Sequence, residues 1–241
     1  MTRRMHLSLV TLGAMTSFAL GYVAPAARAA EVIQPGSSIT MGGSYCTLNW
    51  IYDGTGSQAG NVFGGTAAHC VSGVGQVVYN SSTSLGTQQT RIGTVAYVSS
   101  ALDSALILID TARHADVVAS LKGHPGIPTG VSANSAVGDL IQFSGHGIGF
   151  HLTQQTQESR VGVLVHDDGT QHYVDGPVTN GDSGGPVANI TDGNTALGIV
   201  NTLGVAASSE FGAAVGEGGV SLPALFADAA ANGFPIELRT I

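Results

Sequence analysis

The chain has 241 residues, only 10% of them charged, and sixteen acidic residues outnumber eight basic ones to give a formal net charge of −8. Such a chain lacks the basic face that nucleic acid or an anionic membrane requires, so neither is expected as a partner. Its 35 glycines, with frequent Ser, Thr and Val, favour short strands joined by tight turns.

The first predicted element is an export signal over residues 1–29. Arg3 and Arg4 form a positively charged start, the apolar run Leu7–Val23 follows, and the small residues of Ala27–Ala29 fit a cleavage site. Thr, Ser and Gly interrupt the apolar run, which disfavours a membrane anchor, and the general secretory route is favoured over a twin-arginine route. We therefore expect a secreted mature protein with five basic and sixteen acidic residues and a formal charge of −11. No later segment is apolar over a length that would span a membrane.

Strand-like runs separated by Asp-Gly and Gly-Gly turns make up most of the remaining chain. Sustained helical periodicity occurs once, over Ser221–Ala231, just before the stop signal Asn232-Gly233. In chain order the predicted strands are Cys46–Tyr52, Gly75–Tyr79, Arg91–Val98, Ser104–Ile109, Leu140–Phe143, Val161–Val165, Pro186–Asn189 and Ala196–Asn201.

A segment with two prolines and two glycines, residues 124–130, divides these runs into two β-rich halves. Each half is long enough for a six-stranded barrel. We predict an all-β fold of two six-stranded antiparallel β-barrels with a short C-terminal helix. The N-terminal barrel would span residues 30–123, the linker residues 124–130 and the C-terminal barrel with its helix residues 131–241. One large sandwich is the alternative.

Two cysteines, Cys46 and Cys70, remain in the exported chain. An oxidising compartment makes a disulfide between them the expected state. Closing that loop would stabilise the fold by roughly 3 kcal/mol in the loop-entropy model.

Three positions carry the residue types of nucleophilic catalysis. Ser183 lies among small residues in Gly-Asp-Ser-Gly-Gly-Pro, and a serine hydroxyl needs a neighbouring base to take its proton. His69, in Thr-Ala-Ala-His-Cys, is the candidate base. Asp103 stands at the start of an apolar run, where an acid costs solvation energy unless it is hydrogen-bonded. It is therefore favoured over Asp110, at the far end of the run, as the carboxylate that orients the imidazole.

The order of these residues along the chain separates the known catalytic arrangements. The Gly-x-Ser-x-Gly pattern at Ser183 also fits α/β-hydrolases, but their histidine follows the serine, and the last histidine here is His172. A subtilisin-like order would need an aspartate before the histidine, where only Asp53 is found after the signal. The order histidine, aspartate, serine is that of chymotrypsin-type enzymes.

With these motifs the chain resembles the chymotrypsin-like (trypsin-like) serine protease family over about residues 33–230. Its segment Gly43–Leu48 is similar to the compact, streptogrisin-like bacterial branch. The resemblance implies two perpendicular barrels with the active site between them. His69 and Asp103 would come from the first barrel and Ser183 from the second.

The resemblance also implies an oxyanion hole formed by the backbone N–H groups of Gly181 and Ser183. Burying the neighbouring Asp182 would require a cationic partner or dense hydrogen bonding. Animal members pair this aspartate with a new N-terminus, and bacterial members often use an arginine shortly before a Gly-x-Gly stretch. The segment Leu140–Ser144 holds no arginine, so Arg160 and the mature N-terminal segment are both candidates.

Substrate specificity in this family depends on a pocket near the serine. Trypsin-like members carry an acid six residues before the nucleophile, where this chain has Pro177, so we expect no preference for Arg or Lys at P1. The resemblance implies that Asn201, Thr202, Leu203 and Gly204 form one wall, and Gly219 part of another. Small walls favour a bulky apolar P1 residue, an expectation that Glu210 and Glu217 could change.

Six further histidines match no compact metal-ligand spacing, so neither a metal nor a cofactor is expected. They are His114, His124, His146, His151, His166 and His172. We predict a secreted, monomeric serine endopeptidase that acts on proteins or peptides through an acyl-enzyme on Ser183. The alternatives are a catalytically silent binding homologue on the same fold and an esterase that uses the same triad.

Overall fold

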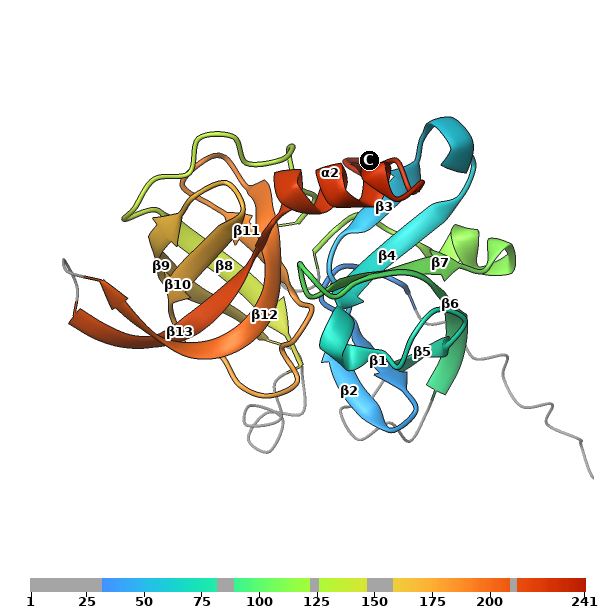
Figure 1. Ribbon diagram of the computed structural model, residues 1–241, viewed down its shortest axis with the longest axis horizontal. Coiled ribbons are helices and arrows are strands. Elements are labelled where there is room, and N and C mark those ends of the chain that lie inside the picture. The colour runs from blue at the N-terminus through green and yellow to red at the C-terminus, as the bar shows by residue number, and fades with distance from the viewer. Residues whose placement is uncertain (1–31, 82–88, 122–125, 147–157, 209–211) are drawn as a thin grey trace, which may run out of the picture.

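The computed structural model describes residues 32–81, 89–121, 126–146, 158–208 and 212–241. The predicted export signal, the first residues of the predicted linker and Glu210 lie outside this part. Two β-units lie next to each other, and a C-terminal helix lies along one side of them (Figure 1). This arrangement confirms the all-β prediction and its short helix. None of the described helices is long and apolar enough to cross a membrane.

The first unit contains seven strands from the N-terminal half and three short 3-10 turns. They are β1 (Ser38–Met41), β2 (Ser44–Thr47), β3 (Ile51–Gly54), η1 (Gly56–Gln58), β4 (Val62–Ala67), η2 (Ala68–Cys70), β5 (Val77–Ser81), β6 (Gln89–Ser99), β7 (Ser104–Ile109) and η3 (Thr111–Asp116). The second half contributes β8 (Leu140–Gly145), β9 (Glu158–Asp167), β10 (Gln171–Asp175), β11 (Pro186–Asn189), β12 (Thr195–Ser208), β13 (Gly212–Ser221), α2 (Leu222–Ala231) and β14 (Ile236–Leu238).

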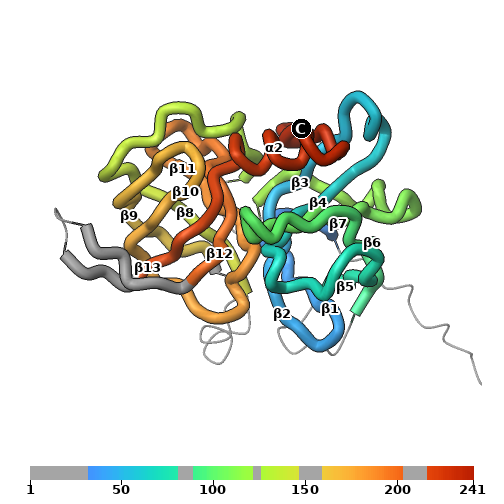
Figure 2. Tube along the Cα trace, viewed as in Figure 1, coloured from blue at the N-terminus to red at the C-terminus, as the bar shows by residue number. Residues whose placement is uncertain are grey.

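The second unit is a closed antiparallel barrel of six strands in the order β10-β13-β12-β11-β8-β9, as predicted. The first unit is an eight-stranded sheet in the order β14-β3-β4-β7-β6-β5-β1-β2. It has two strands more than the six expected, because the N-terminal half contributes seven strands and the C-terminal β14 adds the eighth. The register Glu237↔Asp53 fixes β14 on β3. Figure 2 shows this return of the red C-terminal segment to the first unit.

One predicted strand, Cys46–Tyr52, is two strands in the structure. Between β2 and β3 the backbone bonds to different neighbours: Leu48 N–H donates to Ser37 O and Asn49 N–H donates to Gly65 O. The change of partner ends one strand and starts the next. The pattern of apolar residues in the sequence does not reveal this change of hydrogen-bond partner, because the segments on both sides of it are apolar.

Three clusters of buried hydrophobic side chains form the core of the protein. One fills the first unit, another containing Phe143 and Val200 fills the barrel, and the third lies between the units and α2. This shared cluster combines Trp50 of the first unit with Ile199 of the second, and the Trp50 indole N–H donates to Gly198 O at 2.9 Å. Leu225 of α2 joins the same cluster, and burying such a side chain stabilises the fold by about 1.5–3 kcal/mol. The two units therefore meet across a packed interface.

Candidate active site

The predicted base and its carboxylate lie together because of one strand register. β4 and β7 are antiparallel neighbours, with Ala67 opposite Ser104. His69 lies two residues after Ala67, in η2, and Asp103 lies directly before Ser104, the first residue of β7. The pairing of two buried strands therefore fixes the side-chain contact.

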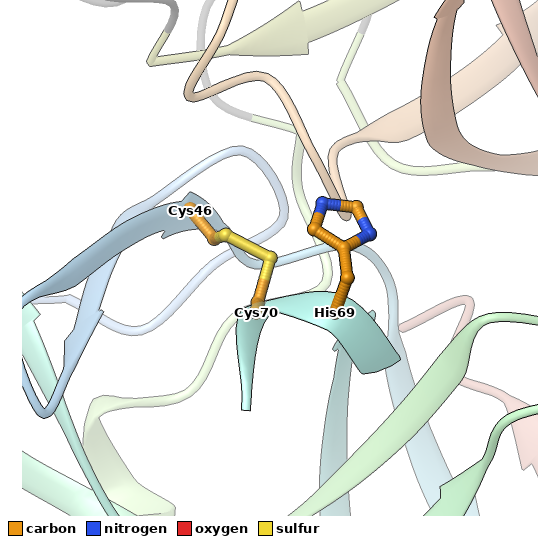
Figure 3. Close-up of side chains that lie close together, drawn as sticks. All are labelled: Cys46, His69 and Cys70. Carbon is orange, nitrogen blue, oxygen red and sulfur yellow. A yellow bond between two sulfur atoms is a disulfide. The ribbon is translucent and has the colours of Figure 1, made fainter. Parts of the chain in front are cut away.

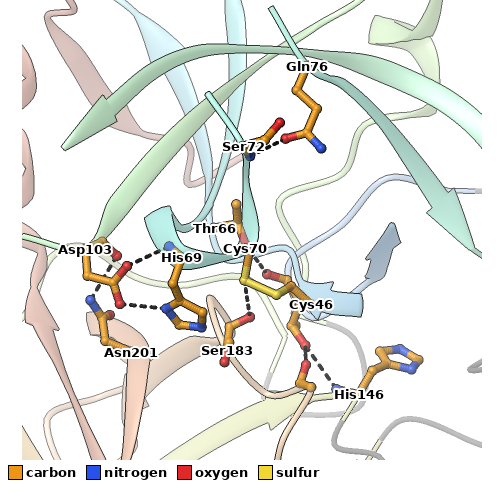
Figure 4. The surroundings of a disulfide bond; sticks show 12 residues. Cys46, Thr66, His69, Cys70, Ser72, Gln76, Asp103, His146, Ser183 and Asn201 are labelled. Carbon is orange, nitrogen blue, oxygen red and sulfur yellow. Dashed lines mark hydrogen bonds and ion pairs between the residues drawn. A yellow bond between two sulfur atoms is a disulfide. The ribbon is translucent and has the colours of Figure 1, made fainter. Parts of the chain in front are cut away.

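Both carboxylate oxygens of Asp103 accept hydrogen bonds from His69. The ring Nδ1 lies 2.7 Å from Oδ2, and the His69 backbone N–H donates to Oδ1 at 2.8 Å. This leaves the other ring nitrogen, Nε2, free of the carboxylate. In the view of Figure 4, the ring lies between Asp103 and Ser183.

The hydrogen bond to Asp103 raises the pKa of His69 above its ordinary value. Partial burial of the ring opposes this increase in pKa, and the charge of Asp103 adds to it. A base must be neutral to accept a proton. The raised pKa therefore moves the onset of any His69-dependent activity to higher pH.

Asp103 has a left-handed backbone, with φ of 45°. This conformation is costly for a residue with a side chain, although Asp tolerates it better than most. The Asn201 side-chain amide donates to the backbone carbonyls of Leu102 and Asp103, at 3.0 and 2.9 Å. A residue of the second unit thus holds the strained turn of the first. The sequence predicts a pocket wall for Asn201, and the structure adds its contact with the Asp103 turn.

The Ser183 loop is attached to the first unit through Thr47 at the end of β2. The Thr47 N–H donates to Ser183 O at 2.9 Å, and its hydroxyl donates to Gly181 O at 2.8 Å. The same hydroxyl accepts from the His146 N–H at 3.0 Å. Sequence reasoning missed Thr47; its position next to Cys46 is the only signal in the sequence that could have drawn attention to it.

Glycine is required where this loop meets the first unit. Gly184 has φ of 81°, and a Cβ there would lie 2.3 Å from the Thr66 hydroxyl. Gly181 has φ of 103°, which favours glycine because a side chain would be strained. Within the described residues, no hydrogen-bond acceptor takes the N–H of Gly181 or of Ser183. Both amides are therefore available for the predicted oxyanion hole.

Asp182 forms a buried, two-pronged ion pair with Arg160 of β9. Arg160 Nη1 lies 2.7 Å from Oδ2 and Nη2 lies 2.5 Å from Oδ1, and the side chains are 6% and 1% exposed. The Thr179 N–H also donates to Asp182 Oδ2 at 2.8 Å. Gly145 leaves room for the carboxylate, because a Cβ there would lie 2.2 Å from Oδ1.

The N-terminal segment, the other candidate partner of Asp182, lies on the first unit. The Ile33 N–H donates to Asp116 O at 2.9 Å, and the Val118 N–H donates to Ile33 O at 3.0 Å. Ile33 is fully buried in the core of that unit. Of the two candidates left open by the sequence, the structure therefore selects Arg160.

Cys46 and Cys70 form the predicted disulfide next to His69 (Figure 3). Among the described residues, these three lie close enough together to be considered as ligands of a metal ion. Because the two sulfur atoms are bonded to each other, they offer no thiolate to a metal ion. The disulfide is therefore a structural support beside the predicted base His69.

The predicted pocket residues are only partly brought together. Asn201, Thr202 and Gly219 line a cavity of about 150 Å³ beside Asp103. Pro177 is exposed and does not line this cavity. The other two wall residues, Leu203 and Gly204, pair through their backbones with Glu217 and Gly216, and the Leu203 side chain is outside the described part of the structure.

The two β-units, with a histidine–aspartate pair in one and a glycine-bounded serine in the other, define the fold class of the two-barrel serine proteases. The family model described as Trypsin matches residues 54–216, so the chain belongs to the trypsin family of serine proteases. No curated protein matches the chain.

Solved structures of bacterial-type proteases share the fold. Thermobifida fusca protease A aligns with a TM-score of 0.57 and 18% identity, over 87% of this chain and 100% of that one. A glutamic-acid-specific serine protease that uses a histidine triad in substrate binding aligns with a TM-score of 0.58 and 20% identity, over 86% and 100%. Cellulomonas bogoriensis chymotrypsin gives 0.54 and 17%, over 87% and 100%. At these identities the likeness shows the fold alone.

Proposed function

We propose that this chain is a secreted serine endopeptidase that cleaves peptide bonds through an acyl-enzyme on Ser183. The Ser183 Oγ attacks the scissile carbonyl carbon while His69 Nε2 takes the hydroxyl proton. The negative charge that develops on the carbonyl oxygen is stabilised by the N–H groups of Gly181 and Ser183. His69 then gives the proton to the leaving amine, and a water molecule hydrolyses the acyl-enzyme by the same steps in reverse.

The observation that carries this proposal is the double hydrogen bond between His69 and Asp103. It fixes the ring tautomer with the proton on Nδ1, so that Nε2 can act as the base, and it supports the imidazolium that forms during the reaction. A silent binding homologue would be free to lose any of the three residues. The intact set therefore favours an enzyme.

Secretion, peptide or protein substrates and a monomeric state complete the proposal. Secretion is supported by the predicted signal over residues 1–29 and by the disulfide. The excess of acidic residues argues against nucleic acid as a partner.

A serine-directed fluorophosphonate probe tests the proposal. Folded protein should be labelled at Ser183, and S183A should not be labelled. Lack of labelling of folded protein would leave the silent homologue as the better interpretation. Casein hydrolysis compared with hydrolysis of small esters then separates an endopeptidase from an esterase, because only the former degrades the protein substrate.

The preference at P1 is proposed to be a bulky apolar residue over Arg or Lys. The support is from the sequence: Pro177, rather than an acid, stands six residues before Ser183, while the structure leaves Pro177 exposed and outside the cavity beside Asp103. The structural neighbours do not assign this preference, because one is specific for glutamic acid and another is a chymotrypsin. Matched peptides with Phe, Leu or Arg at P1 test it.

A further inference from the structure

The chain contains two Asn-Gly sequences, Asn180-Gly181 beside Ser183 and Asn232-Gly233 after α2. In such a pair, the backbone nitrogen of the glycine can attack the side-chain amide carbon of the asparagine. Glycine permits this approach because it has no side chain and its backbone torsions are little restricted. The attack requires a glycine N–H that is not held in another hydrogen bond, so the surroundings of the two pairs decide which one reacts.

The pair at the end of α2 is protected, because both reacting groups are engaged. The Gly233 N–H donates to Ala230 O at 3.1 Å. The Asn232 side-chain amide donates to Asp228 O at 2.8 Å, which fixes the side chain on the helix. Both bonds satisfy carbonyl groups at the C-terminal end of the helix, and reaction at this pair would break them.

The pair beside Ser183 lacks this protection. Thr179 O accepts from the Asp182 N–H at 3.1 Å, so Asn180 and Gly181 are the two central residues of a tight turn. Within the described residues, neither the Gly181 N–H nor the Asn180 side chain has a hydrogen-bond partner. Asn180 is exposed to solvent, so ammonia can leave its side chain and water can reach it.

The Gly181 N–H is one of the two donors of the predicted oxyanion hole. Gly181 is buried, and a buried N–H without an acceptor is rare in proteins. The loop is held on both sides of this group, by the Asp182 N–H bond to Thr179 O and by the Thr47 hydroxyl, which donates to Gly181 O. A donor that stays open for the substrate is therefore also open to the neighbouring Asn180 amide.

We propose that Asn180 is a site of spontaneous deamidation that disables the oxyanion hole and so limits the working life of the enzyme. Its effect on activity rests on the proposed function. The Gly181 nitrogen forms a bond to Asn180 Cγ, the Cγ–Nδ2 bond breaks, and the proton from Gly181 leaves with ammonia. Water then opens the resulting succinimide ring at one of its two carbonyl groups, which gives aspartate or isoaspartate.

Each product changes the oxyanion hole. The succinimide has no N–H at Gly181, and isoaspartate lengthens the backbone before Gly181 by one methylene group. Aspartate keeps the backbone but places a negative charge next to the position where the oxyanion forms. Loss of one oxyanion-hole donor lowers kcat by about 10²–10³, so chains with an altered backbone should be nearly inactive.

The chemical step is tested by ageing folded S183A at mildly alkaline pH and mapping its peptides by mass spectrometry. S183A cannot digest itself, so this result does not depend on the proposed function. We expect deamidation at Asn180 and an unmodified Asn232, which serves as the internal control. If Asn180 deamidates no faster than Asn232, the inference is overturned.

The effect on activity is tested with aged wild-type enzyme, separated by ion exchange into unmodified and modified fractions. The kcat of the isoaspartate fraction should be about 10²–10³ lower than that of the unmodified fraction. N180Q should keep its own starting activity, because the longer side chain would have to close a larger ring. Wild type whose Ser183 carries a fluorophosphonate adduct should keep its Asn180 amide, because the phosphoryl oxygen accepts from the Gly181 N–H.

N180D is the matched control for charge, because it carries the new carboxylate on an unaltered backbone. It should keep more activity than the isoaspartate fraction, and equal losses would overturn the inference. A modified fraction with unchanged kcat would also overturn it while leaving the proposed function intact. Fresh, folded wild type that is not labelled by the fluorophosphonate would instead overturn the proposed function.

Discussion

The two units hold their parts of the candidate site in different ways. His69 and Asp103 are neighbours because two adjacent strands pair in one register, and their side chains are 46% and 32% exposed. The Ser183 loop is instead held by the buried Arg160–Asp182 pair and by Thr47, which is 134 residues away from Gly181 in the chain. The His69–Asp103 part of the site thus depends on the pairing of two adjacent strands, whereas the Ser183 loop depends on long-range buried polar contacts. Damage to the first should affect rate, and damage to the second should affect both rate and folding.

The largest expected effect on rate is at Asp103. D103N removes the charge and favours the wrong tautomer of His69, and a loss of about 10⁴ in kcat is known for the same replacement in this type of triad. Because the side chain is partly exposed, the urea midpoint should change little. Steady-state kinetics and denaturation of one preparation test both statements. A large loss of stability would contradict the contrast between the two units.

Replacing Arg160 should destabilise the protein and displace the Ser183 loop. R160M leaves the carboxylate of Asp182 buried without its ion-pair partner and should lower the free energy of unfolding by about 3–5 kcal/mol, with loss of activity. Urea denaturation with an unchanged m-value measures this loss.

A matched control for R160M is R91M. Arg91 forms an exposed ion pair with Asp110, and such pairs contribute little to stability. The double variant R160M/D182N should recover part of the stability, because the neutral amide no longer needs a cation. If R160M unfolds at the urea concentration of R91M, the buried pair does not hold the loop.

A smaller effect on rate is expected from replacing Asn201, which connects the second unit to the Asp103 turn of the first. N201A releases the carbonyl groups of Leu102 and Asp103, and relaxing backbone strain of about 1–3 kcal/mol would misplace the carboxylate. The rate should fall by about tenfold. Since the hydrogen bond to Asp103 raises the pKa of His69, loosening it should lower that pKa and move the acid limb of the pH profile of kcat/KM to lower pH.

T202A is the control for N201A, because Thr202 is the next residue but its hydroxyl donates to Gly218 O rather than to the Asp103 turn. Its pH profile should match that of the wild type. An N201A enzyme that is slower with an unchanged acid limb would show that Asn201 supports packing only.

The smallest effect is expected at the N-terminus. Because Arg160 already pairs with Asp182, adding a few residues before the mature N-terminus should leave kcat/KM within about twofold of the unextended enzyme. Fluorophosphonate titration of both forms supplies the concentrations for this comparison. Strong inhibition by the extension would mean that a free N-terminus helps to form the site.

The sequence was sufficient for features whose signals are local. The small residues around Ser183, the acid before the apolar run of β7 and the cysteine pair are each readable within a few positions. The pairing of β14 with β3 could not be predicted from the sequence, because a three-residue strand shows no periodicity and its partner lies about 180 residues earlier.

Contacts that depend on closure of the barrel could not be predicted from the sequence either. Arg160 could not be chosen over the N-terminal segment until the register of β8 and β9 fixed which residues face the Ser183 loop. Glu217 could not be placed, because a glutamate among glycines is typical of an exposed turn and here is buried. Pro177, expected in the pocket, is exposed.

The disulfide joins the two sides of the site at their most sensitive points. Cys46 precedes Thr47, which holds the Ser183 loop, and Cys70 follows His69. One covalent bond therefore ties the support of the nucleophile to the position of the base. In a reducing cytosol that bond is absent, so the full alignment of the site depends on an oxidising compartment.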